Sequence, residues 1–265
     1  TVLFMLLLTV FIYSMLYKNI TTPLSELGNV SSAVKKGDYS IRSTFKKRNE
    51  FGILSDQINA MLDNIEKQNH LATNSAMLTN YMMSAIDAKT FFEQLLTGLL
   101  KYTNGQFGGI YVLSDDKIRY ELIHSIGMDS NSRKSFDKQS LEGELGFSIS
   151  AKEIKLISDI PDNSSVLPPT SIYNYKSKEL MTIPIKGTKN TIAVGTLGSI
   201  NGFAPNSKEL LENILDIINA RTHGILAYHE MDQIKKSLEI KNRELENQQK
   251  ELNNQGLELL EQNRE

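Results

Sequence analysis

The stretch KNITTPLSELGNVSSAVKKGDYSIRSTFKKRNEFGILSDQINAMLDNIE, residues 18–66, decides how this chain is organised. Pro23 opens a first helix, Gly37 interrupts it, and Asn49 precedes a second helix. Apolar residues recur every three or four positions of the second helix, at Phe51, Leu54, Ile58, Met61 and Ile65. Because a helix with such a stripe must bury it against other helices, the stretch predicts a small helical bundle with partners.

A run without charged residues precedes this stretch. Residues 2–17 carry only apolar and mildly polar side chains, and Lys18 ends the run. At 1.5 Å per residue the run extends about 24 Å, less than the ~30 Å hydrocarbon core of a bilayer. We therefore expect residues 1–17 to be the C-terminal part of a transmembrane helix, preceded by another span and an extracytoplasmic region. A signal peptide would need a basic segment and a small-residue cleavage site, and neither is present.

Basic residues follow the apolar run at Lys18, Lys35, Lys36 and positions 46–48. The positive-inside rule then predicts that everything after residue 18 lies in the cytoplasm. The 265 residues include no cysteine, which excludes disulfides and thiolate metal sites and agrees with a reducing compartment. The net charge of −2 does not favour a nucleic-acid partner.

Residues 18–70 resemble a HAMP domain, the relay of bacterial transmembrane receptors. The residues that carry the resemblance are Pro23, Leu27, Gly37, Asp38, Asn49, Glu50, Phe51, Gly52, Leu54, Asn59 and Met61. The resemblance implies a parallel bundle that relays motion, with relay roles for Pro23, Leu27, Gly37, Asn49, Glu50, Phe51, Gly52 and Leu54. The alternative is an ordinary coiled-coil stalk, which would not need the interruption at Gly37.

The middle of the chain predicts an α+β fold with a mostly antiparallel sheet. Helices are expected over residues 67–103, over 142–150 and from 208 onward. Strands are expected at 108–114, 118–126, 155–158, 180–185 and 191–200, and the polar residues 129–140 are expected to form a loop. From residue 229 a signalling coiled coil is expected, because Met231, Leu238, Leu245, Leu252 and Leu259 recur every seven residues. Half of its core positions are polar, so it should be weak, and a solvated tail is the alternative.

Residues 76–228 resemble a GAF domain. The resemblance is carried by LEGELG at 141–146 with ISDIP at 157–161, by LMTIPI at 180–185 with AVGTL at 193–197, and by Phe203 ahead of a helix. It implies a small-molecule ligand between the sheet and the loop at 159–161, with Tyr111, His124, Phe147, Ile149, Tyr173, Tyr175 and Thr182 as candidate lining residues. The signature of the cyclic-nucleotide-binding members is not found. A filled core that serves dimerisation and relay is the alternative.

The sequence contains no recognisable catalytic set or metal site. None of the histidines, His70, His124, His223 and His229, has a phosphoacceptor setting, and no phosphate-binding glycine loop occurs. The order of the modules resembles the input region of membrane sensor histidine kinases. The resemblance implies a span in a bacterial inner membrane, with ATP and Mg²⁺ bound only by a kinase core after residue 265 that serves a response regulator. A parallel homodimer is expected because the apolar seams at 51–65 and 231–259 both need partners. A non-enzymatic chemoreceptor-like transducer, or a sensor with a cyclase or phosphatase output, is the alternative.

Overall fold

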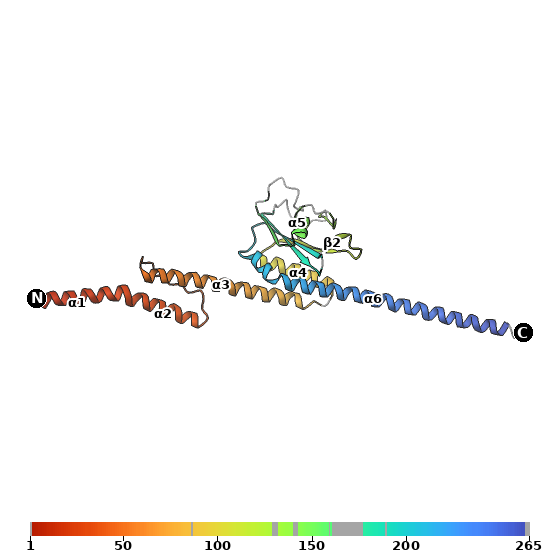
Figure 1. Cartoon of the computed structure of the whole chain (residues 1–265), viewed down its shortest axis with the longest axis horizontal. Coiled ribbons are helices and arrows are strands. Elements are labelled where there is room, and N and C mark those ends of the chain that lie inside the picture. Colours follow the sequence, from red (N-terminus) through yellow and green to blue (C-terminus); the bar gives the residue numbers. More distant parts are fainter. Residues whose placement is uncertain are drawn as a thin grey trace. The chain divides into compact units, whose positions relative to one another are not determined.

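The computed structural model describes residues 2–85, 87–128, 132–139, 143–158, 160, 177–188 and 190–262. The chain divides into two compact units, residues 1–74 and residues 75–265, and each is described by itself. Helix α3 begins in the first unit and ends in the second (Figure 1).

The first unit is helical. It contains α1 (Val2–Leu16), the π-helical turn η1 (Tyr17–Thr21), α2 (Thr22–Lys35) and the first part of α3 (Glu50–Met83). The continuous helix from Val2 to Lys35 is long and apolar enough to cross a membrane, and α1 buries none of its side chains. The wider turn η1 lies where Pro23 cannot donate a backbone hydrogen bond to Asn19 and its ring crowds that carbonyl, which explains the local departure from an α-helix.

The apolar stripe predicted for α3 is not buried within one chain. Inside the first unit α2 buries Pro23, Leu27 and Val30, while α3 buries Gly52, Ser55 and Leu62. The predicted stripe lies beside this buried face: Leu54 and Met61 are 42% and 50% exposed, and Phe51, Ile58 and Ile65 are half-buried. The stripe is therefore open to a partner outside the chain.

The second unit is an α+β domain with an antiparallel sheet, as predicted. Its elements are α4 (Ala88–Thr103), β1 (Phe107–Leu113), β2 (Arg119–Ile126), β3 (Ser135–Asp137), α5 (Gly143–Ala151), β4 (Lys155–Ser158), β5 (Glu179–Lys186), β6 (Thr191–Ser199) and α6 (Ser207–Gln262). The strand order is β3-β2-β1-β6-β5-β4, and every described pairing is antiparallel.

The structure refines one prediction for this unit and corrects another. Residues 67–103 are mostly helical, as expected, but they form two helices: α3 ends at Met83 and α4 begins at Ala88, because Asp87 caps the new helix by accepting a hydrogen bond from the Thr90 amide at 2.9 Å. The expected loop at 129–140 contains the edge strand β3, which pairs with β2 through three residues.

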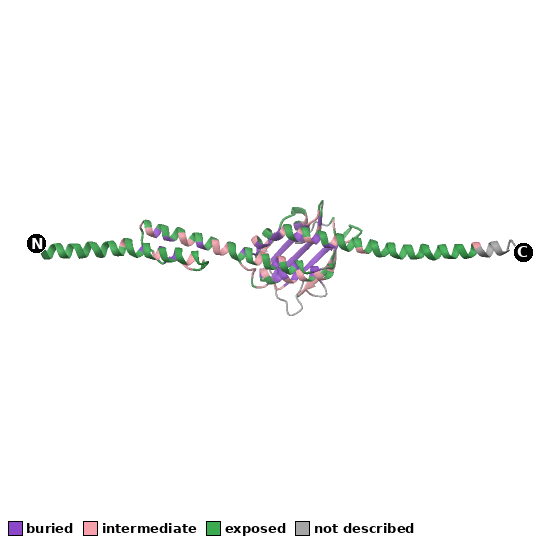
Figure 2. Ribbon diagram, turned by 90° about the horizontal axis from the view of Figure 1, so that it is seen from below, coloured by how far each residue is buried: buried purple, intermediate pink, exposed green. Residues whose placement is uncertain are grey.

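The two faces of the sheet are covered differently (Figures 1 and 2). The larger core joins side chains of the sheet, such as Ile110 and Ile183, to apolar residues of α4 and α6. A smaller core on the other face includes Tyr111 and Val194 of the sheet and Leu145 of α5. Beyond Ile225 the described side chains of α6 are no longer buried, and its heptad residues Met231, Leu238, Leu245 and Leu252 are each more than half exposed.

Alanine substitutions at two glycines, Gly198 and Gly224, test this packing through the free energy of unfolding. Gly198 of β6 lies opposite Phe107 of β1, and a Cβ at Gly198 would lie 2.1 Å from the Phe107 ring, which is only 4% exposed. Gly198→Ala should therefore lower the free energy of unfolding by about 1–3 kcal/mol. Gly224 lies in α6, where a Cβ would extend into open space, so Gly224→Ala should instead raise it by about 0.5–1 kcal/mol.

Thermal unfolding followed by circular dichroism would compare the two variants with the native chain. Equal stability of the Gly198→Ala variant and the native chain would contradict the packing described for β1 and β6.

Candidate relay site and ligand-binding face

The connector, residues 36–49 between α2 and α3, contains no helix or strand. It contacts α2 and the preceding turn in reverse order along the chain. Lys47 Nζ donates a hydrogen bond to Asn19 Oδ1 at 3.0 Å. The Ser43 and Thr44 hydroxyls each donate to Glu26 Oε1 at 3.0 Å, and the Thr44 amide donates to the same oxygen. The connector therefore runs antiparallel to α2.

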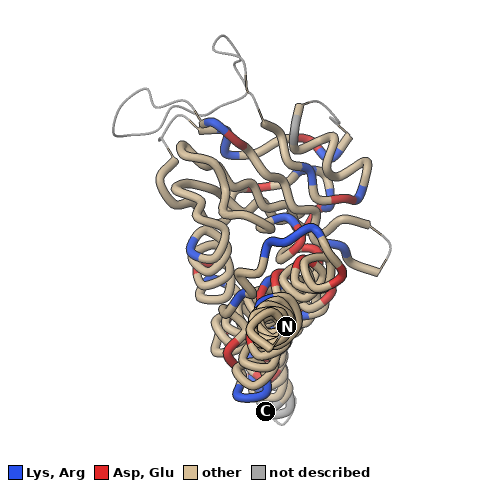
Figure 3. The backbone as a smooth tube through the Cα atoms, turned by 90° about the vertical axis from the view of Figure 1, so that its left-hand side faces the viewer, with Lys and Arg blue, Asp and Glu red and all other residues tan. Residues whose placement is uncertain are grey.

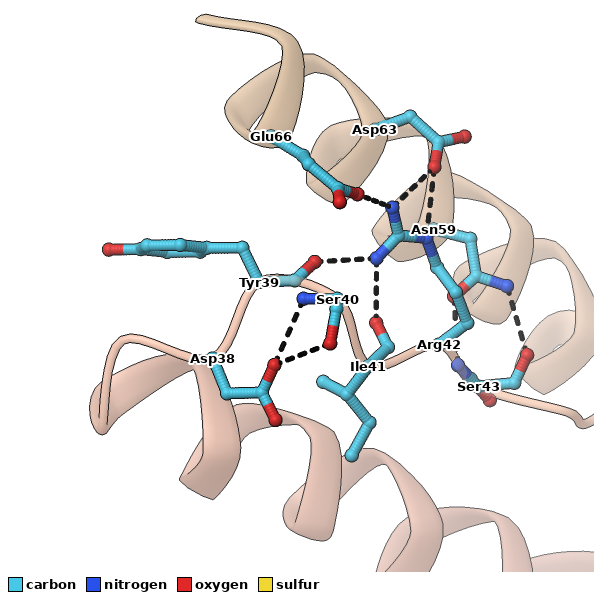
Figure 4. A network of polar contacts seen from close by, with 9 residues as sticks. All are labelled: Asp38, Tyr39, Ser40, Ile41, Arg42, Ser43, Asn59, Asp63 and Glu66. Carbon is cyan, nitrogen blue, oxygen red and sulfur yellow. Dashed lines mark hydrogen bonds and ion pairs between the residues drawn. The ribbon is translucent and has the colours of Figure 1, made fainter. Parts of the chain in front are cut away.

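The connector also runs antiparallel to α3. Ser43 and Asn59 exchange two hydrogen bonds: the Ser43 amide donates to Asn59 Oδ1 at 2.8 Å, and Asn59 Nδ2 donates to the Ser43 carbonyl at 2.9 Å. The preceding residue, Arg42, reaches further along α3 to Asp63 and Glu66 (Figure 4). Because the connector is antiparallel to both helices, α2 and α3 are parallel to each other.

Arg42 is the centre of the polar network drawn in Figure 4. Its Nε donates to Asp63 at 2.9 Å and its Nη2 to Glu66 at 2.7 Å, while Nη1 donates to the carbonyls of Tyr39 and Ile41 at 2.6 and 2.9 Å. The hydrogen bond to Asp63, followed by that to Glu66, raises the pKa of the Arg42 guanidinium above its usual value. Arg42 thus supplies hydrogen bonds that the irregular backbone cannot obtain from a ladder.

Glycine is required where the connector begins and again directly after it ends, in the first turn of α3. Gly37 follows α2 with φ of +87°, a conformation that side chains disfavour. Past the other end of the connector, a Cβ on Gly52 would lie 1.7 Å from the Lys47 carbonyl oxygen, so only glycine allows this close approach.

Asn49 caps α3, because its Oδ1 accepts a hydrogen bond from the Gly52 amide at 3.1 Å. Next to Gly37, hydrogen bonds from Ser40 lower the pKa of the Asp38 carboxyl.

The remaining predicted relay residues lie around this network. Pro23 and Leu27 are buried on α2. Phe51 packs its ring edge against Phe45 with centroids 6.5 Å apart, and Leu54 is exposed on the open stripe. Glu50 is exposed in the first turn of α3, where a carboxylate is favoured by the helix dipole.

Sequence reasoning missed Glu26, Arg42, Asp63 and Glu66, which make most of the network. Polar residues in a connector and on helix faces look like solvated residues in a single sequence, and the partners are 17 to 24 positions apart. Asn59 was noticed, but only as part of the family resemblance. No local signal identifies which of these side chains meet.

In the second unit, two rungs of the sheet form the face beneath α5. Tyr111, Val194 and Pro184 make one rung, and Gly109, Thr196 and Thr182 make the next. The first rung is filled: Tyr111 packs against Phe136, which stacks on Tyr120, and the Tyr111 hydroxyl donates to the Arg133 carbonyl at 3.0 Å. Burial raises the pKa of Tyr120 to about 12.

The second rung is smaller and more polar. The Thr182 hydroxyl is buried and has no hydrogen-bond partner among the residues that the structure describes. Ser55, Ser132, Thr191 and Thr222 also carry buried hydroxyls without a described partner. Thr182 is the one that lies on the two rungs beneath α5, so its rung is the candidate ligand-binding face. Ile149 packs against the neighbouring aromatic cluster.

The other predicted lining residues are not brought to this rung. His124 pairs with Ile110 and so lies on the face covered by α4 and α6, away from Tyr111 and Thr182. Phe147 is 50% exposed, with Lys155 Nζ 5.1 Å from its ring centroid. Tyr173 and Tyr175 lie outside the described residues. Within the described residues, no three His, Asp or Glu side chains are grouped to hold a metal ion.

Arg221 of α6 links two helices of the second unit. Its Nη2 donates to the Ala85 carbonyl at 2.7 Å and to the Met83 carbonyl at 3.4 Å. Met83 is the last residue of α3, and a cation is favoured by the negative end of a helix. The end of α3 is therefore attached to α6 by a side chain as well as by apolar packing.

Comparison with known proteins agrees with this arrangement. Residues 15–67 match the family model of the HAMP domain, so the first unit contains a HAMP domain. The methyl-accepting chemotaxis protein McpC of Bacillus subtilis (strain 168) is 31% identical over 88 residues, which are 32% of this chain. The chain spans only 13% of the length of that curated relative.

Solved structures resemble the second unit. The GAF domain of a phosphoenolpyruvate-protein phosphotransferase from Coxiella burnetii aligns with a TM-score of 0.50 and 13% identity, covering 61% of this chain and 97% of that one. The corresponding Acinetobacter domain aligns with a TM-score of 0.48 and 16% identity, over 60% and 94% of the two chains. The second unit thus has a GAF-like fold. At these identities the likeness concerns the fold alone.

Arg42→Gln should loosen the connector. The variant removes the four hydrogen bonds of the guanidinium, while the peptide bonds after Lys46, Lys47 and Arg48 remain available to trypsin. We expect cleavage at 46–48 to become several-fold faster, because proteolysis follows the population of the open segment.

Lys35→Gln is the matched control, since Lys35 carries the same charge and is exposed at the end of α2. Mass spectrometry of timed digests would report the rates at these bonds. Equal rates in the Arg42→Gln variant and the native chain would show that Arg42 does not hold the connector.

Proposed function

We propose that this chain is the input and relay segment of a transmembrane sensor histidine kinase of the bacterial inner membrane. The observation that carries the proposal is the order of parts: a membrane-length apolar helix, a HAMP domain, a GAF-like domain and an exposed heptad helix. HAMP and GAF-like modules in series support signal transduction. The kinase core, with its ATP and Mg²⁺, would follow residue 265, and a response regulator would receive the phosphoryl group.

The contacts suggest how a signal is relayed. A movement of the span reaches α2 directly, because α1, η1 and α2 are one continuous helix. The connector joins α2 to α3 through Glu26, Ser43 and Asn59. In the second unit Arg221 attaches the end of α3 to α6, which leads towards the output. A relay of this kind needs two arrangements within a few kcal/mol of each other, whose balance each input changes.

The GAF-like domain supplies a second input in this proposal. A small ligand over the Gly109, Thr196 and Thr182 rung would satisfy the Thr182 hydroxyl and press on α5. A core that remains filled without a ligand, and serves only dimerisation and relay, is the competing possibility.

A chemoreceptor-like output is the second candidate function. The local similarity to a methyl-accepting chemotaxis protein favours it, and the same relay contacts would serve it. In that case α6 would continue into a non-enzymatic signalling helix rather than into a phosphoacceptor helix.

We predict that the chain forms a parallel homodimer. Leu54 and Met61 of α3 and Met231, Leu238 and Leu245 of α6 are exposed apolar residues at heptad spacing, and one parallel dimer buries both sets. Sedimentation of residues 18–265 at micromolar concentration should give a dimer. Leu238→Asp together with Leu245→Asp should weaken it, whereas the solvent-face change Glu239→Asp should not. A native chain that sediments only as a monomer would contradict the prediction.

Phosphorylation distinguishes a kinase output from a chemoreceptor-like output. Residues 1–265 should not become phosphorylated with labelled ATP and Mg²⁺, because the sequence offers no nucleotide cradle. The longer protein should acquire acid-labile phosphate if the output is a kinase, and none if it is chemoreceptor-like. Acid-labile phosphate on His70, His124, His223 or His229 of the present chain would overturn this assignment.

A further inference from the structure

Four basic residues lie at the end of the apolar helix, and we call Lys18, Lys46, Lys47 and Arg48 the basic cluster. Lys18 is the first charged residue after the apolar run. The other three are distant from Lys18 in sequence. The hydrogen bond from Lys47 Nζ to Asn19 Oδ1 at 3.0 Å brings them near Lys18, because Asn19 is the next residue. All four side chains are exposed. Figure 3 colours the basic residues of the chain blue.

Neighbouring contacts hold the cluster in place. Lys47 Nζ lies 5.9 Å from the centroid of the Phe45 ring, and that ring packs edge-on against Phe51 of α3. The Lys47 carbonyl accepts a hydrogen bond from the Asn49 amide at 2.9 Å, directly before α3 begins. The cluster is therefore fixed both to the end of the span and to the start of α3.

Ion pairs among the described residues do not neutralise the charges of the cluster. The ion pairs described for the first unit are those of Arg42 with Asp63 and Glu66, and none of them involves a member of the cluster. The nearest acidic residue in sequence, Glu50, lies in the first turn of α3, where the helix dipole already favours it. A concentrated positive charge remains exposed.

The depth of the cluster matches the headgroup layer of a bilayer. Tyr13 and Tyr17 stack with centroids 6.2 Å apart at the end of the span, and tyrosine is enriched at membrane interfaces. Asn19 lies three residues beyond Leu16, or about 5 Å along a helix. The polar layer on each side of the hydrocarbon core is about 5–7 Å thick. Lys47 therefore contacts the chain where lipid phosphates are found.

We propose that the basic cluster binds the headgroups of anionic phospholipids in the leaflet that faces the HAMP domain. Lysine and arginine donate charge-assisted hydrogen bonds to phosphate oxygens, and juxtamembrane basic clusters are attracted to acidic leaflets. The proposal rests on the membrane anchoring in the proposed function. It adds a consequence: because residues 46–48 directly precede α3, lipid charge acts on the start of α3 as well as on the span.

The test uses the full chain inserted in vesicles of phosphatidylcholine with a minor fraction of phosphatidylglycerol. Spin-labelled phosphatidylglycerol and phosphatidylcholine report, by electron paramagnetic resonance, which lipid is immobilised on the protein. The variant Lys46→Gln with Arg48→Gln removes two charges and keeps the Lys47 hydrogen bond. The control Lys35→Gln with Lys36→Gln removes the same charge at the far end of α2, about 28 Å along the helix from Leu16.

The native chain should prefer phosphatidylglycerol, and the preference should weaken with salt. It should fall by up to about 25-fold in the Lys46→Gln, Arg48→Gln variant, because each of the two removed basic residues contributes about fivefold to binding at an acidic surface, and it should stay unchanged in the control. The lipid proposal would be overturned, and the membrane anchoring would stand, if the native chain inserted stably but showed no such preference. An equal loss of the preference in both variants would have the same consequence. Extraction of the native chain from the vesicles by alkaline carbonate would overturn the anchoring together with the lipid proposal.

Discussion

The relay unit depends on one constraint: two parallel helices must be joined by a segment that returns along α2 and along the first part of α3, as far as Glu66. The connector has no strand or helix of its own, so its backbone groups need hydrogen-bond partners from side chains. Glu26 of α2 and Asn59 of α3 bind neighbouring residues of the connector, and Arg42 binds two of its carbonyls while pairing with α3. These contacts are what keep α2 and α3 in register.

The same constraint explains why the unit suits a relay. Arg42 is held by two carboxylates near the surface, where ion pairs are individually weak. The helices bury only a narrow face against each other and leave the stripe of Leu54 and Met61 open. Such an arrangement can change its packing at low cost, provided that the connector keeps the helices parallel. The close approach of Gly52 to the Lys47 carbonyl and the hydrogen bond from Lys47 to Asn19 place the basic cluster between the start of α3 and the end of the apolar helix.

The sequence predicted the features that have a local cause. Gly37 adopts positive φ and Asn49 caps α3, and both residue types signal these roles by themselves. The antiparallel sheet was predicted from five short strands with helices at both ends of the domain. The strand β3 was missed because its three residues form a short edge with little apolar pattern, and the break before α4 was missed because apolar periodicity continues across Asp87.

What the sequence could not provide are contacts between distant residues. Nothing in the pattern pairs Arg42 with Asp63 and Glu66. The sequence also did not determine which face of the sheet the His124 side chain occupies. A bulge in β2 pairs Ile110 with His124 but Tyr111 with Leu122, so these two residues of β2 lie on opposite faces despite an even spacing. Simple alternation would have placed them together.

Hydrogen exchange at the Ser43 and Thr44 amides tests directly whether side chains of α2 and α3 hold the connector between the two helices. These amides donate to Asn59 and Glu26, although they lie in a segment without regular structure. We expect slow exchange at both positions in the native chain, and faster exchange at Ser43 after Asn59→Ala with little change inside α2. Exchange of both amides in the native chain at the rate of an unstructured peptide would contradict this expectation.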